Sequence, residues 1–266
     1  MTELGGNVIE LELSTNIEDK GVKVSPSEYL LRHTAIIVID PNPNNPTPPN
    51  ITYQDGNGGI SIGWDNNEAR TNSAGGSAAA ITEDGYFLTA YHVVAQGLPW
   101  IVWTEQSADC HAKEHQQLNV SRKIGPIRIV YSNKKADFAI IKAPFDVSAF
   151  LEIRETKAER GEVLFSGGWL NETGAGRVKL TRSKAYEKHL FREMMTSIPL
   201  LEGDSGSPVI DQQGKLCAIS SAAFAKISLV VNLEPSEIDR IIERDRIANK
   251  AVVGMPSRSA TQHPTP

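Results

Sequence analysis

The sequence predicts an all-β fold that ends in a single helix. Short apolar runs rich in β-branched residues recur along the chain, and Gly, Pro, Asn and Asp separate them. Near the C-terminal end, one amphipathic segment has the spacing of a helix instead. Strand-like runs fall into two successive groups on either side of about residue 150, which is compatible with a duplicated barrel.

The first group of runs begins near the N-terminus. Residues 8–13 alternate apolar and acidic side chains, and residues 35–39 have the composition of a buried strand. Residues 77–82 and 86–90 flank an Asp-Gly pair, which predicts a hairpin closed at that pair. Further strands are expected over 98–104, 127–131 and 138–142.

Pro, Asn and Gly crowd the segment between Asp40 and Gly76. Proline lacks an N–H and does not sustain a strand ladder. We therefore expect residues 40–76 to be a surface insertion that carries one short strand at 59–64. The second group of strands is expected over 162–166, 177–181, 208–210, 215–221 and 227–233.

The helix is expected over residues 234–250. Pro and acidic residues stand at its start, and Ile238, Ile241 and Ile242 recur at helical spacing. Residues 251–266 are polar and Pro-rich, which favours a disordered tail. The predicted organisation is an extension over 1–30, a first barrel over 31–150, a second barrel over 151–233, the helix and the tail.

Charge and hydropathy exclude two classes of partner. The chain has 27 basic and 32 acidic residues, a net charge of −5 and a pI near 5.7. Nucleic-acid affinity depends on Lys and Arg that neutralise phosphates, so we expect no nucleic-acid partner. No run approaches the roughly 18 apolar residues of a membrane-spanning helix, so we expect no membrane partner either.

Cysteine usage favours a reducing compartment. Cys110 and Cys217 are the only two cysteines, too few for a disulfide framework. The first thirty residues lack the apolar segment of a secretory signal, so a cytoplasmic location is expected. Cys110, His111 and His115 do not match a zinc-ligand spacing, so we expect neither a metal nor another cofactor.

Three segments carry the chemistry. The first, Glu202-Gly-Asp-Ser-Gly-Ser-Pro, sets Ser205 between glycines that permit a tight turn with converging N–H groups. His92 ends an apolar run and is a candidate general base. Asp137 begins a strand that is apolar on both faces, where a carboxylate needs a hydrogen-bond donor such as a histidine.

These segments resemble the active-site motifs of the chymotrypsin-like (trypsin-like) serine peptidases. In that family His, Asp and Ser follow this order, in contexts such as TAAH, D-x-A-L and GDSGGP. The resemblance spans about residues 30–245 and implies two six-stranded antiparallel Greek-key barrels with a C-terminal helix. The rival α/β-hydrolase motif needs Gly at position 207, which is Ser, and a later histidine; only His263 in the tail follows.

The resemblance implies a serine endopeptidase that hydrolyses peptide bonds through an acyl-enzyme. Ser205 is then the nucleophile, His92 the general base and Asp137 the residue that orients it. Backbone N–H groups of Gly203 and Ser205 form the oxyanion hole. The expected partner is a protein or peptide substrate.

The resemblance also implies a substrate pocket lined by Pro199, Ser220 and Ala222. No acidic residue stands at the pocket base, and Ala222 replaces a usual glycine, so cleavage after small or medium apolar residues is expected. Lys226 is the alternative determinant and would favour acidic side chains. Asp204, which pairs with a liberated N-terminus in extracellular members, is expected to need another partner.

Two alternatives stand beside a constitutive peptidase. One is a non-catalytic descendant that uses the fold as a binding module. The other is a latent protease activated by a protein partner, with the 40–76 insertion or the first 30 residues as the contact.

Overall fold

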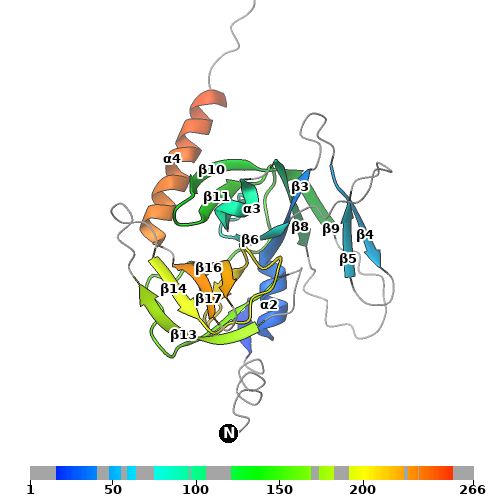
Figure 1. Ribbon diagram of the computed structural model, residues 1–266. Coiled ribbons are helices and arrows are strands. Elements are labelled where there is room, and N and C mark those ends of the chain that lie inside the picture. The colour runs from blue at the N-terminus through cyan, green and yellow to red at the C-terminus, as the bar shows by residue number, and fades with distance from the viewer. Residues whose placement is uncertain are drawn as a thin grey trace, which may run out of the picture.

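The strands of the computed structural model form two large sheets, and one long helix follows them (Figure 1). The structure describes residues 16–40, 48–54, 59–63, 75–95, 97–105, 121–168, 174–182, 192–224, 227–232 and 234–253. The expected strand over 8–13, much of the 40–76 insertion and the tail beyond residue 253 lie outside these ranges.

The first sheet is antiparallel and has seven strands in the order β10-β11-β7-β6-β3-β8-β9. Its strands are β3 (Thr34–Asp40), β6 (Gly76–Ala80), β7 (Tyr86–Thr89), β8 (Leu98–Glu105), β9 (Ser121–Pro126), β10 (Arg128–Asn133) and β11 (Phe138–Lys142). The expected β6–β7 hairpin is present, and Gly85 in its turn has φ +81°.

The sheet has seven strands where six were expected because one strand bends and is divided in two. Only Ile127 separates β9 from β10. Pro126 has no N–H to continue the ladder, and the Ile127 N–H donates to the carbonyl of Pro99 at 3.0 Å. The chain thus passes from pairing with β8 to pairing with β11. The two edge strands of this sheet are consecutive parts of one bent strand.

The second sheet is a closed barrel of six strands in the order β12-β13-β14-β17-β16-β15. These are β12 (Val163–Ser166), β13 (Gly174–Arg182), β14 (Arg192–Thr196), β15 (Pro208–Ile210), β16 (Leu216–Phe224) and β17 (Ile227–Asn232). The last strand returns between β14 and β16, as in a Greek key. The expected chymotrypsin-like all-β fold with a C-terminal helix is confirmed.

Strand alternation explains why the first sheet is apolar on both faces. Along β11, Phe138 and Ile140 join a core cluster that also contains Phe165 of the second barrel. Ala139 and Ile141 point the other way, into a second cluster with Phe87. Side chains on a strand point alternately to its two faces, so this strand is buried against two separate cores. The first of these cores is therefore shared by residues of both sheets.

The expected N-terminal extension contributes to this core. Two short strands, β1 (Ile17–Asp19) and β2 (Val22–Val24), precede the helix α2 (Pro26–His33). Ile17 and Leu30 are 1% and 0% exposed and lie in the cluster shared by both barrels. Ser25 caps the helix by accepting from the Glu28 N–H at 3.2 Å.

The structure contains further elements that the sequence did not predict. In the insertion, β4 (Asn50–Gln54) pairs with β5 (Gly59–Gly63), and only the second of these was expected. A short helix, α3 (Tyr91–Val94), follows β7. Strands β9 and β14 were not predicted either.

The C-terminal helix α4 (Pro235–Val253) runs beside β10 (Figure 1) and extends three residues beyond its expected end. Ile238 and Ile242 bury its apolar face in the shared cluster. Further along, Asp245 accepts hydrogen bonds from Tyr86 at 2.7 Å and from Arg128 at 2.6 Å. In the described part of the chain, no helix has the length and apolar character needed to cross a membrane.

Candidate functional site

Strand register brings His92 and Asp137 together. Strands β7 and β11 pair antiparallel, with Thr89 opposite Ala139. The end of one strand therefore meets the start of the other, and the two candidate residues follow and precede these ends. Asp137 Oδ2 lies 2.8 Å from His92 Nδ1, and Asp137 Oδ1 accepts the His92 backbone N–H at 2.9 Å.

The carboxylate of Asp137 has a third donor on the second barrel. Ser221 in β16 donates its hydroxyl to Asp137 Oδ2 at 2.6 Å. The sequence predicted no catalytic role for this serine. No local motif distinguishes it from Ser220, so its role became visible only when the barrels were placed together.

These contacts shift both pKa values in opposite directions. The hydrogen bond to Asp137 raises the pKa of His92, and this effect outweighs the opposing effect of burial. Burial alone would raise the pKa of Asp137, but the hydrogen bonds from His92 and Ser221 overcome it and the pKa is lowered. Asp137 is consequently ionised at neutral pH, with a histidine whose basicity it increases.

Asp137 has an unusual backbone conformation. Its φ is +52°, in the left-handed region that few residues other than glycine adopt. The turn before it is held by Asn133, whose Oδ1 accepts the N–H groups of Lys135 and Ala136 at 3.1 Å each. Asp and Asn tolerate this region better than most side chains, which favours a carboxylate here.

Ser205 is placed by the pairing of β15 with β16. Just before β15, the Gly206 N–H donates to the Ser220 carbonyl at 2.8 Å. The Ser205 hydroxyl then lies 3.5 Å from the carbonyl oxygen of Ser221, its acceptor. The same residue, Ser221, therefore contacts both Asp137 through its side chain and Ser205 through its backbone.

Glycine is required beside the nucleophile candidate. Gly206 has φ +84°, and a Cβ there would lie 2.0 Å from the Ser77 carbonyl oxygen and 2.3 Å from Thr89 Oγ1. Gly203 also has a positive φ, +98°. Within the described residues, neither the Gly203 N–H nor the Ser205 N–H has an acceptor. The turn thus offers two backbone donors beside the Ser205 hydroxyl.

Asp204 is buried under this turn, and the structure identifies a partner for it. The Leu201 N–H donates to Asp204 Oδ2 at 2.7 Å, and the Asp204 N–H donates back to the Leu201 carbonyl at 3.1 Å. Asp204, which is 4% exposed, therefore stabilises its own loop through its carboxylate and its backbone N–H.

The three predicted pocket residues differ in accessibility. Pro199 is exposed and Ala222 is half-buried. Ser220 is fully buried, and its Oγ lies 3.1 Å from Ser166 Oγ. Lys226, the alternative determinant, lies outside the described residues.

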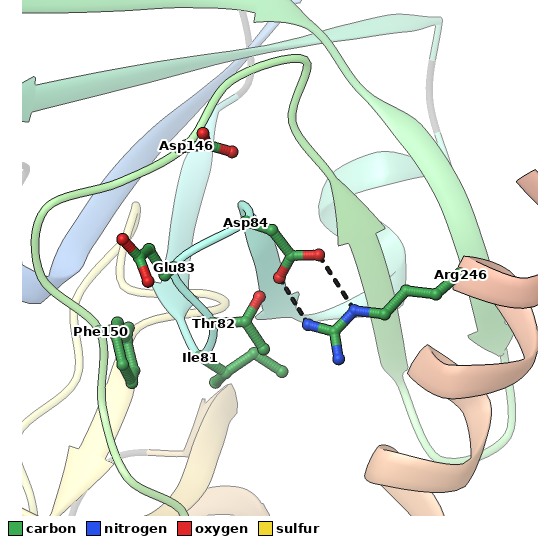
Figure 2. Close-up of a pocket in the computed structure, with 7 residues that line it drawn as sticks. All are labelled: Ile81, Thr82, Glu83, Asp84, Asp146, Phe150 and Arg246. Atoms are coloured by element: carbon green, nitrogen blue, oxygen red, sulfur yellow. Dashed lines mark hydrogen bonds and ion pairs between the residues drawn. The ribbon is translucent and has the colours of Figure 1, made fainter. Parts of the chain in front are cut away.

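A separate cavity of about 480 Å³ lies at the other end of the β6–β7 hairpin (Figure 2). Asp84 and Arg246 form an ion pair at one side, with Arg246 Nη2 2.6 Å from Asp84 Oδ1. The remaining lining residues are Ile81, Thr82, Glu83, Asp146 and Phe150. None of the predicted site residues lines this cavity.

No cluster of potential metal ligands occurs among residues that the structure describes. Cys110, His111 and His115 fall outside them. Cys217 is buried and unbonded to another cysteine, and burial raises the pKa of its thiol to about 12.

Comparison with known families gives one match. The family described as trypsin-like peptidase domain matches residues 76–219, a segment that includes His92, Asp137 and Ser205. A comparison with curated proteins returned no match. The matched segment is more than half of the chain and contains the paired strands that bring His92 and Asp137 together, so the chain belongs to the family of trypsin-like peptidase domains.

Proposed function

We propose that the chain is a serine endopeptidase in which Ser205 is the nucleophile. One observation carries the proposal: His92 and the Ser221 hydroxyl both hydrogen-bond to Asp137, and the Ser205 hydroxyl donates to the backbone carbonyl of Ser221. This arrangement links a base, its orienting carboxylate and a hydroxyl through one residue, Ser221. It supports nucleophilic acyl transfer without a cofactor.

The proposed reaction follows from these groups. His92 accepts the hydroxyl proton of Ser205 as Ser205 Oγ attacks the scissile carbonyl, and Asp137 stabilises the resulting imidazolium. The negative charge that develops on the carbonyl oxygen is met by the N–H groups of Gly203 and Ser205. His92 then donates the proton to the leaving amine, and water hydrolyses the acyl-enzyme by the same steps.

Labelling by a fluorophosphonate tests the nucleophile. The wild type is expected to react, and Ser205→Ala to lose all labelling. Ser207→Ala is a matched control because it removes another hydroxyl two residues away, and it should label normally. Labelling that persists in Ser205→Ala would place the nucleophile elsewhere. A wild type that never reacts, alone or in a lysate of the source cell, would favour a binding module.

For specificity, we propose cleavage after small or medium apolar residues. Neither Pro199 nor Ala222 has a charged side chain that could pair with a cationic head group. Burying an unpaired charge is costly, so substrates with Lys or Arg at that position should be disfavoured by at least about a hundredfold in kcat/KM.

A peptide library tests this preference. Cleavage mainly after Ala, Val or Leu is the expected result, and Ala222→Gly should shift it toward larger side chains. Cleavage after Asp or Glu would instead assign the pocket to Lys226, and cleavage after Lys or Arg would refute an apolar pocket.

A further inference from the structure

The nucleophile turn, residues 203–206, is held by a serine of the first barrel. Ser77 lies on β6 and is 1% exposed. The last pair between β6 and β7 is Ala79 with Leu88, so Ser77 lies beyond the ladder on that side. Its backbone groups therefore need other partners, because unpaired buried backbone groups are costly.

The nucleophile turn and Thr89 supply those partners. The Ser77 N–H donates to the carbonyl oxygen of Ser205 at 2.8 Å. The Ser77 carbonyl accepts the Thr89 hydroxyl at 2.7 Å. The Ser77 hydroxyl donates to the carbonyl oxygen of Gly203 at 3.4 Å. One residue of the first barrel thus contacts carbonyl groups on both sides of the Asp204–Ser205 peptide.

These contacts bear on the direction of the proposed oxyanion donors. The Ser205 N–H belongs to the peptide between the two that Ser77 holds. The Gly203 N–H precedes the carbonyl that the Ser77 hydroxyl contacts. Fixing the Gly203 and Ser205 carbonyls limits rotation of the Asp204–Ser205 peptide between them, so the Ser205 N–H keeps one orientation. Donors that are already oriented stabilise developing charge without reorganisation.

We propose that Ser77 is a positioning residue that sets the direction of the Ser205 oxyanion donor through its side-chain hydroxyl. This inference rests on the proposed peptidase activity. It also predicts that the hydroxyl acts on the reaction step more than on substrate binding, because Ser77 itself is buried and does not reach a bound peptide.

A neighbouring serine provides a matched control. Ser207 is 0% exposed, and its Oγ has no hydrogen-bond partner among the described residues. A Cβ built at Gly168 would lie 3.4 Å from the Ser77 hydroxyl and 3.6 Å from that of Ser207. The two hydroxyls thus share one buried environment, but only that of Ser77 contacts the turn.

The experiment compares Ser77→Ala with Ser207→Ala. Both variants lose a buried hydroxyl, and both keep their backbone N–H. For Ser77→Ala we expect a fall in kcat of roughly 3- to 10-fold, the effect of one neutral hydrogen bond, with KM within about twofold of the wild type. The rate of fluorophosphonate labelling should fall in the same proportion. Ser207→Ala should keep kcat and the labelling rate within about twofold.

Several results would overturn the proposal. These are an unchanged kcat in Ser77→Ala, an effect confined to KM, or an equal loss in Ser207→Ala, which would indicate packing alone. Amide hydrogen exchange of residues 203–206 provides a measurement independent of activity. Faster exchange in Ser77→Ala than in Ser207→Ala supports the contact even if the wild type is never labelled, a result that would refute only the peptidase. Equal exchange in both variants refutes the positioning role.

Discussion

The two halves of the candidate site are held in different ways. On the first barrel, His92 and Asp137 are fixed by side-chain hydrogen bonds, and the two side chains are 47% and 24% exposed. On the second barrel, the turn at Ser205 is fixed by backbone hydrogen bonds. It also contains Gly206, where a Cβ would have no space.

Substitutions in the first half therefore affect the chemistry of the side chains, whereas substitutions in the second half affect the backbone conformation. In the first half, a substitution that preserves shape changes protonation and leaves the backbone in place. In the second half, an added methyl group displaces the backbone itself. Variants in the two halves should therefore fail differently, the first in reactivity with normal stability and the second in both.

The largest effect is expected in the first half, from Asp137→Asn. Asn tolerates φ +52°, so the fold should be retained, but its amide no longer holds His92 in the reactive tautomer. We expect turnover to fall by roughly 10⁴-fold near neutral pH. Steady-state hydrolysis of a peptide whose chemistry is rate-limiting measures this loss, and a thermal melt checks the fold. A loss below tenfold would assign the orienting role to another carboxylate.

The second half should respond to Gly206→Ala in both activity and stability. The new Cβ meets the Ser77 carbonyl oxygen at 2.0 Å and occupies a left-handed backbone position. A displacement of about 1 Å at a reacting group lowers turnover by roughly 10²-fold, and the strained position costs about 1–3 kcal/mol. Urea unfolding and kinetics should report both losses together. Full activity with normal stability would show that the turn at Ser205 does not depend on a glycine at position 206.

Ser221→Ala tests the link between the halves. The variant removes the 2.6 Å hydrogen bond to Asp137 but keeps the backbone carbonyl near Ser205. A hydrogen bond to a charged group is worth about 1.5–3 kcal/mol, so kcat should fall at least tenfold. Ser166→Ala is the control, since its hydroxyl pairs with Ser220 away from Asp137. Equal losses in both variants would indicate a general packing effect.

The pH dependence of activity tests the role of His92 and Asp137 in the first half. The proposed mechanism requires the base form of His92, and Asp137 raises the pKa of His92 above the ordinary 6.5. Activity should therefore rise with pH through a midpoint above 6.5. In Asp137→Asn this cause is absent and burial lowers the pKa, so the midpoint should move down. The protonated imidazole stabilises the fold fully below pH 6.5, and this contribution disappears as pH rises through the folded pKa. An unshifted midpoint would show that another group titrates.

The smallest effect is expected outside both halves, from Arg246→Ala. Its ion pair with Asp84 is largely solvated, with side chains 35% and 42% exposed, so its loss should cost no more than about 1 kcal/mol. The kcat should stay within about twofold of the wild type. Urea unfolding measures the first quantity and peptide hydrolysis the second. A large loss of activity would indicate that the ion pair between Arg246 of α4 and Asp84 influences the distant candidate site.

The sequence by itself determined the all-β class, the principal strands and the three candidate residues. Buried strands such as 138–142 and the turn around Ser205 have patterns that depend on neighbouring residues alone, namely apolar runs and glycines. Helix α2 is also encoded locally, by the N-cap Ser25 and by Pro26 in its first turn, although it was not among the predicted elements.

Tertiary structure decided what depends on residues far apart in the chain. Ser220 pairs with Val230 of β17, whereas Ser221 falls at the register shift between Ser220 and Ala222. Packing of the two barrels then brings Ser221 to Asp137, while Ser220 lies against Ser166. Ser77 contacts the turn at Ser205 because β6 pairs with β7 only as far as Ala79, and the turn occupies the position beside Ser77 instead. Side-chain direction and strand ends are set by packing between the barrels, so no local pattern reveals them.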